Sequence, residues 1–173
     1  EPEPQDSWYQ LYYQALFNQK KFDTAELVLK GMLTRDPLNG VLWRMLASHY
    51  LQLEESTSGL ASLMIAYSNE LLESGSDLQQ IVSLWGYVEA PERGARLMEE
   101  WLASGRLETD ADALKQLGNL WLMARERHNA VTALAAAAEL SPDGRTYEML
   151  GGIHFEDEHW VDAYSAYQNA LQQ

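Results

Sequence analysis

The sequence predicts an all-α protein, a right-handed α-solenoid of about five helix pairs and therefore about ten antiparallel helices. The main observation is an internal repeat in the last third of the chain, and its period of roughly 33 residues is typical of stacked helical repeats. The first copy contains Leu114, Leu117, Gly118, Trp121, Ala130, Leu134, Ala137 and Pro142. The second copy contains Tyr147, Leu150, Gly151, His154, Ala163, Tyr167 and Ala170. No alternating run is long enough to indicate a strand.

These residue types and spacings resemble the tetratricopeptide repeat (TPR), in which a large residue and a small one on the first helix are followed by a small one on the second. The resemblance implies TPR-like helix pairs. Its physical basis is close packing. Gly118 and Gly151 leave room for the second helix of each pair, and Ala130 and Ala163 do the same from the other side. Aromatic residues then fill the space between successive pairs.

The earlier repeats follow the same pattern with less regularity. The first places Tyr9 and Tyr13 on one helical stripe, and Pro37 ends its second helix. In the second repeat, Trp43 takes the position that Tyr9 has in the first. The third repeat diverges most, although Pro91 suits the first turn of a helix.

We predict helix starts near residues 7, 22, 41, 57, 76, 92, 111, 128, 145 and 160. The corresponding repeats cover about 6–39, 40–74, 75–110, 111–143 and 144–173. Together they form a single superhelical domain over residues 7–173, preceded by a mobile acidic lead-in over residues 1–6.

Composition excludes several classes of function. The formal net charge of −14 argues against nucleic acid and anionic lipid as partners, because both select basic surfaces. No apolar run approaches the ~18 residues that a spanning helix needs, so we expect no membrane insertion.

The sequence shows no arrangement of nucleophile, base and oxyanion donor, and no glycine-rich phosphate loop. We therefore predict that the chain is not an enzyme and has no catalytic residues and no cofactor. His154 and His159 lie close in sequence around an acidic run, which is compatible with a metal site. The alternative is that His154 packs, because it takes the place of an aromatic residue of the repeat. We favour packing and predict no metal.

The first helices of a solenoid line its concave face, where we predict a groove for a protein or peptide partner. The residues predicted to line it are Gln10, Gln14, Arg44, Ser48, Gln52, Gln79, Ser83, Lys115, Asn119 and Arg145. With Glu148 added, this set has three basic residues and one acidic residue, so it favours a partner that carries carboxylates. Lys115 and Asn119 also resemble half of the carboxylate clamp of some TPR proteins. The matching asparagine of the next repeat is replaced by Gly152.

Over nearly its whole length the chain is similar to the periplasmic TPR proteins that accompany TonB–ExbB–ExbD systems. The resemblance is carried by Trp8-Tyr9, Ala90-Pro91 with Gly94-Ala95-Arg96, Leu117 to Trp121 with Ala124-Arg125-Glu126, and Leu140 to Gly144 with Leu150 to Ile153. It implies a non-catalytic periplasmic scaffold that assists TonB-dependent uptake by binding other envelope proteins, with TonB-system components as possible partners.

Two further interpretations stay open. The chain could instead be a cytoplasmic TPR adaptor that binds an acidic peptide end. The last predicted helix pair also presents Tyr164, Tyr167, Ala170 and Leu171, so self-association through this C-terminal edge is expected.

Overall fold

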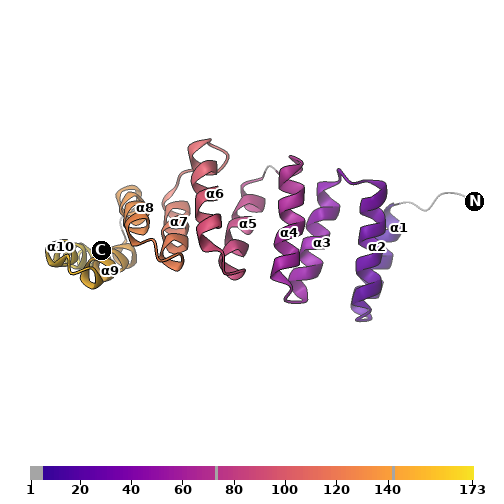
Figure 1. Cartoon of the computed structure of the whole chain (residues 1–173), viewed down its shortest axis with the longest axis horizontal. Coiled ribbons are helices and arrows are strands. Elements are labelled where there is room, and N and C mark those ends of the chain that lie inside the picture. The colour runs from indigo at the N-terminus through magenta and orange to yellow at the C-terminus, as the bar shows by residue number, and fades with distance from the viewer. Residues whose placement is uncertain (1–5, 73, 142) are drawn as a thin grey trace, which may run out of the picture. The chain divides into compact units, whose positions relative to one another are not determined.

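The computed structural model describes residues 6–72, 74–141 and 143–173, and it confirms the all-helical prediction. Within these ranges the chain forms ten α-helices and no strand (Figure 1). The helices are α1 (Asp6–Asn18), α2 (Phe22–Arg35), α3 (Gly40–Gln52), α4 (Ser56–Ser68), α5 (Gly75–Tyr87), α6 (Pro91–Ala103), α7 (Ala111–Met123), α8 (Arg127–Leu140), α9 (Gly144–Glu156) and α10 (Trp160–Ala170). Every predicted helix start lies within one residue of the observed start. Residues 1–5 of the predicted lead-in and Pro142 of the repeat lie outside the described residues, and Asp6 begins α1.

The chain divides into two compact units, residues 1–84 and 85–173, and each has its own core. We refer to them as the N-terminal and C-terminal units. The predicted single domain over residues 7–173 stays a prediction.

In the N-terminal unit, α2 and α3 supply the centre of the core. The buried residues there are Leu29, Met32, Leu33, Leu42 and Leu46. Tyr9, Tyr13, Trp43 and Tyr50 pack against them. The start of α3 is fixed by the Asn39 side chain, which accepts hydrogen bonds from the backbone nitrogens of Val41 and Leu42. Such an N-cap satisfies amides that have no partner within the helix.

In the C-terminal unit, two tryptophans are fully enclosed. Trp101 of α6 and Trp121 of α7 are both buried, and the Trp121 indole nitrogen donates to Glu99 Oε1 at 3.0 Å. Towards the end of the chain the core consists of Leu134, Ala138, Leu150, Ile153 and Ala166.

The predicted close packing of paired helices is confirmed at two glycines. A Cβ atom on Gly118 would lie 2.6 Å from Leu134 Cγ, and one on Gly151 would lie 2.8 Å from Tyr167 Cε1. Both distances are shorter than carbon atoms tolerate, so α7 and α9 can accept their partner helices only without a side chain here. Ala130 and Ala163, which pack from the second helix of each pair, are buried.

Each helix pair closes with the same turn. A residue with positive φ precedes the second helix, namely Lys20, Glu54, Glu89, Arg125 or Glu158. The next residue then donates its backbone N–H to a carbonyl five positions earlier, as His159 does to His154 at 2.8 Å. This hydrogen bond occupies a carbonyl at the end of the first helix. The turn therefore fixes which side chains of the two helices meet.

Candidate protein-binding surfaces

The residues predicted to bind a partner all lie on first helices. Gln10 and Gln14 lie on α1, Arg44, Ser48 and Gln52 on α3, Gln79 and Ser83 on α5, Lys115 and Asn119 on α7, and Arg145 on α9. All are exposed except Lys115, which is partly buried. Seven belong to the N-terminal unit and three to the C-terminal unit. That these ten residues line one concave groove stays a prediction.

In the N-terminal unit, Arg44 forms an ion pair. Its Nη1 atom lies 3.0 Å from Asp77 Oδ2, and Asp77 is buried with 7% of its surface exposed. The same carboxylate oxygen accepts a hydrogen bond from Ser74 Oγ at 2.7 Å. A buried carboxylate with these two partners fixes the position of the guanidinium.

In the C-terminal unit, Lys115 is paired as well. Its Nζ atom lies 2.8 Å from Asp112 and 3.5 Å from Asp143, and the hydrogen bond to Asp112 is the main reason that its pKa is raised. Asp143 is the N-cap of α9 and accepts hydrogen bonds from the Thr146 hydroxyl at 2.7 Å and backbone at 2.8 Å. These two bonds, with a smaller contribution from Lys115, lower the pKa of Asp143.

Two of the three cations predicted to bind a partner are therefore paired within the chain. The sequence pattern indicates Glu148 as the one acidic residue of the predicted groove. Asp77 and Asp143 are not part of that pattern. Asp77 lies in the repeat after Arg44, and Asp143 is the last residue of the repeat that contains Lys115 and the N-cap of α9. Arg145 forms no ion pair with the described residues. The predicted residues are polar, but the charges of Arg44 and Lys115 are neutralised within the chain.

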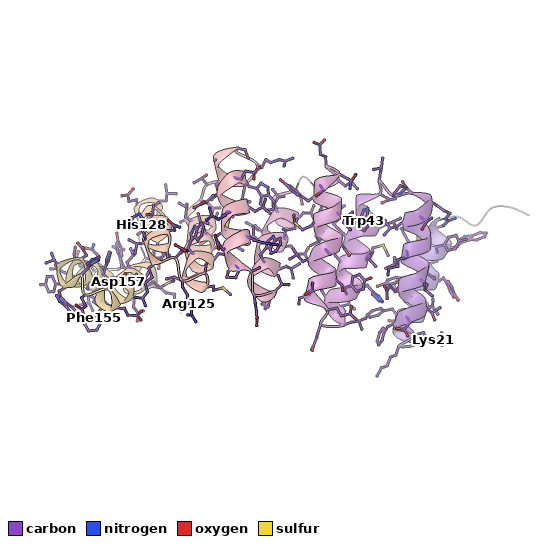
Figure 2. The ribbon with its side chains drawn as sticks, viewed as in Figure 1. Lys21, Trp43, Arg125, His128, Phe155 and Asp157 are labelled. Atoms are coloured by element: carbon purple, nitrogen blue, oxygen red, sulfur yellow. The ribbon has the colours of Figure 1, made fainter. Side chains whose placement is uncertain are left out.

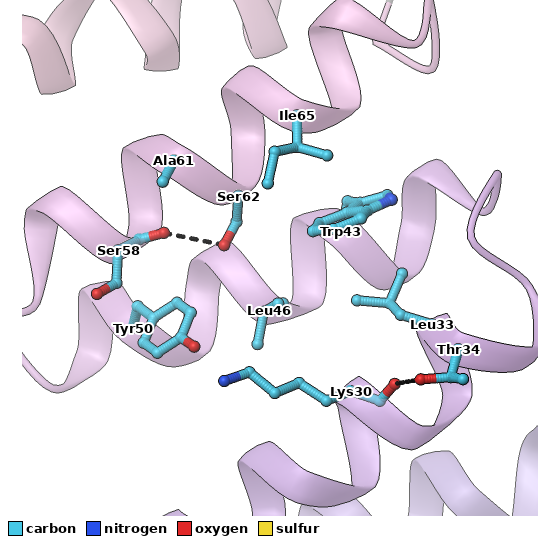
Figure 3. A pocket seen from close by; sticks show the side chains of 10 residues that line it. All are labelled: Lys30, Leu33, Thr34, Trp43, Leu46, Tyr50, Ser58, Ala61, Ser62 and Ile65. Carbon is cyan, nitrogen blue, oxygen red and sulfur yellow. Dashed lines mark hydrogen bonds between the residues drawn. The ribbon is translucent and has the colours of Figure 1, made fainter.

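A groove that the sequence does not predict lies in the N-terminal unit, between α2, α3 and α4 (Figure 3). It has a volume of about 610 Å³. Leu33 of α2, Trp43 and Leu46 of α3, and Ala61 and Ile65 of α4 give it an apolar lining. The predicted site used first helices only, whereas α2 and α4 are the second helices of their pairs.

Two of the polar residues that line this groove, Lys30 and Tyr50, both bind the Glu26 carboxylate. Glu26 Oε1 accepts a hydrogen bond from the Tyr50 hydroxyl at 2.6 Å and lies 2.5 Å from Lys30 Nζ. The bonds from Lys30 and Tyr50 lower the pKa of Glu26, and the bond to Glu26 raises the pKa of Lys30. The Trp43 indole nitrogen donates to the Pro37 carbonyl at 2.9 Å, so its only polar atom is satisfied outside the groove.

Apolar side chains are also exposed at the end of the C-terminal unit. On α10, Val161 and Tyr164 are 81% and 69% exposed. Beside them, Phe155 and Trp160 pack edge to face with ring centroids 5.1 Å apart. Figure 2 labels Phe155, which lies on α9, and Asp157, the C-cap residue of that helix. Asp157 and Glu156 both bind Arg127, the first residue of α8.

The two histidines considered for metal binding, His154 and His159, meet at the α9–α10 turn, with ring centroids 6.1 Å apart. Asp162, which the sequence pattern does not single out, lies beside them.

No helix among the described residues combines the length and apolar character needed to cross a membrane. No family model matches the sequence, and no curated protein matches it.

Solved structures do resemble this chain. A crystal structure of MamA is 21% identical, covers 92% of each chain and has a TM-score of 0.68. A MamA structure from Desulfovibrio magneticus RS-1 is 12% identical, covers 96% of this chain and 93% of that one, and has a TM-score of 0.69. The crystal structure of YrrB, described as a TPR protein with an unusual peptide-binding site, is 16% identical, covers 95% of this chain and 84% of that one, and has a TM-score of 0.70. At these identities the likeness establishes the fold alone, and that fold is the TPR α-solenoid.

Proposed function

We propose that this chain is a non-catalytic scaffold that binds a segment of another protein. The observation that carries the proposal is the groove between α2, α3 and α4, whose mainly apolar lining includes a few polar residues. Recesses of this composition bind apolar side chains and orient them through a few polar groups. The description of YrrB as a TPR protein with a peptide-binding site supports the same function.

The groove favours a particular kind of segment. Trp43 and Ile65 offer apolar contact at one part of the lining, while Lys30 stands at another with its side chain 54% exposed (Figure 3). An ammonium group has three donors, so Lys30 retains donors beyond the one directed to Glu26. We therefore propose a segment with an apolar anchor and a nearby carboxylate or carbonyl oxygen.

The exposed polar residues of the first helices supply a second part of this proposal. Gln14, Ser48 and Gln79 carry amide and hydroxyl groups that can bond the main chain of a bound segment. Arg145, which has no ion pair with the described residues, is the predicted cation best placed to bind a partner's carboxylate.

The groove is tested by site-specific photo-crosslinking in cells that make the full-length protein. A photoreactive residue at Ile65 should capture a discrete partner, whereas one at Leu27 should not. Leu27 is the matched control because it is exposed on α2 and does not line the groove.

Once the partner is identified and purified, it should bind the Ala61→Phe variant at least about tenfold more weakly, because the added ring fills the groove. A factor of ten in affinity is about 1.4 kcal/mol. Equal losses for Ala61→Phe and Leu27→Phe would contradict the proposal.

We further propose that the partner belongs to the cell envelope and that the protein assists TonB-dependent uptake from the periplasm. The resemblance to periplasmic TPR proteins of TonB–ExbB–ExbD systems supports this assignment. In fractionated cells the full-length protein should be periplasmic, and the Ile65 crosslink should contain TonB, ExbB, ExbD or a protein bound to them. A cytoplasmic protein crosslinked to a partner with an acidic end would contradict this assignment and support the adaptor alternative.

A further inference from the structure

The turn between α9 and α10 brings three potential metal ligands together. His154 lies in the last turn of α9, His159 is the N-cap residue of α10, and Asp162 lies in the first turn of α10. Each offers one ligand atom, and these atoms all lie within 4.8 Å of one another. His159 and Asp162 are exposed and His154 is partly buried, so the cluster is open to an ion in solution.

The fold itself produces this convergence, because every helix pair closes with the same hydrogen-bonded turn. Side chains at the corresponding positions of other pairs also meet. In the third pair, Arg93 Cζ lies 6.0 Å from the centroid of the Trp85 ring, and these residues correspond to Asp162 and His154. In the second pair, Ser58 donates to Glu55 at 3.3 Å, and these residues correspond to Asp162 and His159. The scaffold thus presents three adjacent positions, and the last pair fills them with two histidines and an aspartate.

The ligand atoms are not committed elsewhere. His154 Nδ1 is buried and has no hydrogen-bond partner among the described residues, so this imidazole carries an unsatisfied polar atom. His159 makes no side-chain capping bond to α10. Two neighbouring carboxylates, those of Glu156 and Asp157, are both bound to Arg127, and the group whose ligand atoms converge consists of His154, His159 and Asp162. The available set is therefore two imidazoles and one carboxylate.

We propose that His154, His159 and Asp162 bind a divalent transition-metal ion of the zinc type. Two imidazoles and one carboxylate suit Zn²⁺ and its neighbours, whereas Mg²⁺ and Ca²⁺ require oxygen ligands. Three protein ligands leave a fourth tetrahedral position for water or for a group from a partner. Metal–ligand bonds of about 2.0–2.1 Å place the ligand atoms of a tetrahedral site roughly 3.3 Å apart. We therefore expect the exposed side chains of His159 and Asp162 to move towards the ion when it binds.

Binding at this place joins the end of α9 to the start of α10. The ion binds the folded turn and not the separated ligands of the unfolded chain, so it stabilises the last helix pair as its concentration rises. The sequence favours packing of His154 in the aromatic position of the repeat. This packing is compatible with metal binding, because the same imidazole ring can pack and also bind the ion.

The test uses the chain without a polyhistidine tag and Zn²⁺ alone as the probe. Equilibrium dialysis should give one bound ion per chain. Even loss of a residue that only supports a metal ligand typically costs about 10–100-fold in affinity, so His159→Ala and Asp162→Ala should each lose at least tenfold. Both side chains are exposed, and circular dichroism should show unchanged helicity.

His128→Ala is the matched control, because His128 is exposed on α8 and lies outside the cluster. This variant should bind Zn²⁺ as the parent chain does. Zn²⁺ should also raise the unfolding temperature of the parent chain and of His128→Ala, and leave that of a His159→Ala, Asp162→Ala double variant unchanged. Absence of saturable binding, or equal binding by the cluster variants and His128→Ala, would overturn the proposal.

Discussion

Arg44 Nη1 lies 3.0 Å from Asp77 Oδ2, and this ion pair joins the first helix of one repeat to the first helix of the next. Lys115 and Asp143 make an equivalent link in the C-terminal unit, at 3.5 Å. In each case the cation is the fifth residue of its helix, and the carboxylate lies at the start of the following first helix. Two of the three cations predicted to bind a partner therefore already hold neighbouring repeats together.

The Arg44 link should contribute measurably to stability. Because the Arg44 side chain is 42% exposed, we expect Arg44→Gln to lower the free energy of unfolding by about 0.2–1 kcal/mol, the range typical of partly exposed pairs. Arg145→Gln is the control and should leave it nearly unchanged, since Arg145 has no ion pair with the described residues. Urea unfolding followed by circular dichroism measures both. Equal effects of the two substitutions would show that the Arg44–Asp77 pair does not stabilise the fold.

A pair of glycine substitutions tests the packing of paired helices. Gly118→Leu forces a side chain into the space held by Leu134, so we expect a loss of about 1–3 kcal/mol or more. Gly31→Leu is the matched control, because no atom lies within 4 Å of a Cβ placed there. Leucine is the better helix former, so Gly31→Leu should stabilise α2 by roughly 0.5–1 kcal/mol. Opposite shifts in the urea midpoint are expected, and shifts of the same sign would contradict this account.

The helices and their close contacts were predictable because they depend on local spacing. Gly118 and Leu134 stand in one repeat, and the next repeat shows the same pattern at Gly151 and Tyr167. A constant repeat period fixes such positions without knowledge of the partner residues.

The binding surfaces were less predictable because they depend on side chains that are distant in the sequence. Asp77 neutralises Arg44 from the following repeat, and the sequence contains no local signal for that pairing. The groove arises where α2 and α4 both border α3, so no single helix encodes it. The position of Asp162 beside His154, in contrast, was predictable from the repeat. The shared turn brings these two positions together in every helix pair, and Arg93 and Trp85 occupy them in the third pair.

The exposed apolar residues of α10 lead to a prediction about assembly. Val161 and Tyr164 are largely exposed, and burial of such side chains is worth about 25 cal/mol per Å². We expect residues 1–173 to self-associate with rising concentration, and Val161→Lys with Tyr164→Lys to abolish this association. Sedimentation velocity measures both. Leu27→Lys is the control, since the Leu27 side chain is about as exposed as that of Tyr164 but lies on α2. A monomeric parent chain at high concentration would contradict the expectation.

His49 gives the fold a specific dependence on pH. It is fully buried in the N-terminal unit beside the rings of Tyr13, Phe17 and Tyr50, and its Nε2 atom has no hydrogen-bond partner among the described residues. Burial lowers the pKa of His49 below its ordinary value of 6.5, although the charges of Glu26 and Glu55 act in the opposite direction. Desolvation therefore favours the neutral imidazole in the folded chain.

The direction of the pH effect follows from proton binding. Between the lowered pKa and 6.5, the unfolded chain binds the His49 proton and the folded chain does not, so a fall in pH favours unfolding. The contribution of neutral His49 is fully present above pH 6.5 and is lost as the pH falls below it.

We expect the free energy of unfolding to decrease from pH 7.5 to pH 5.5, and to decrease less in His49→Phe, which keeps an aromatic ring and cannot be protonated. His128→Gln, at an exposed position, should retain the parent pH dependence. Because carboxylates titrate alike in all three proteins, the difference in urea midpoint between the two pH values isolates His49. Identical differences in the parent chain and His49→Phe would show that His49 does not couple folding to pH.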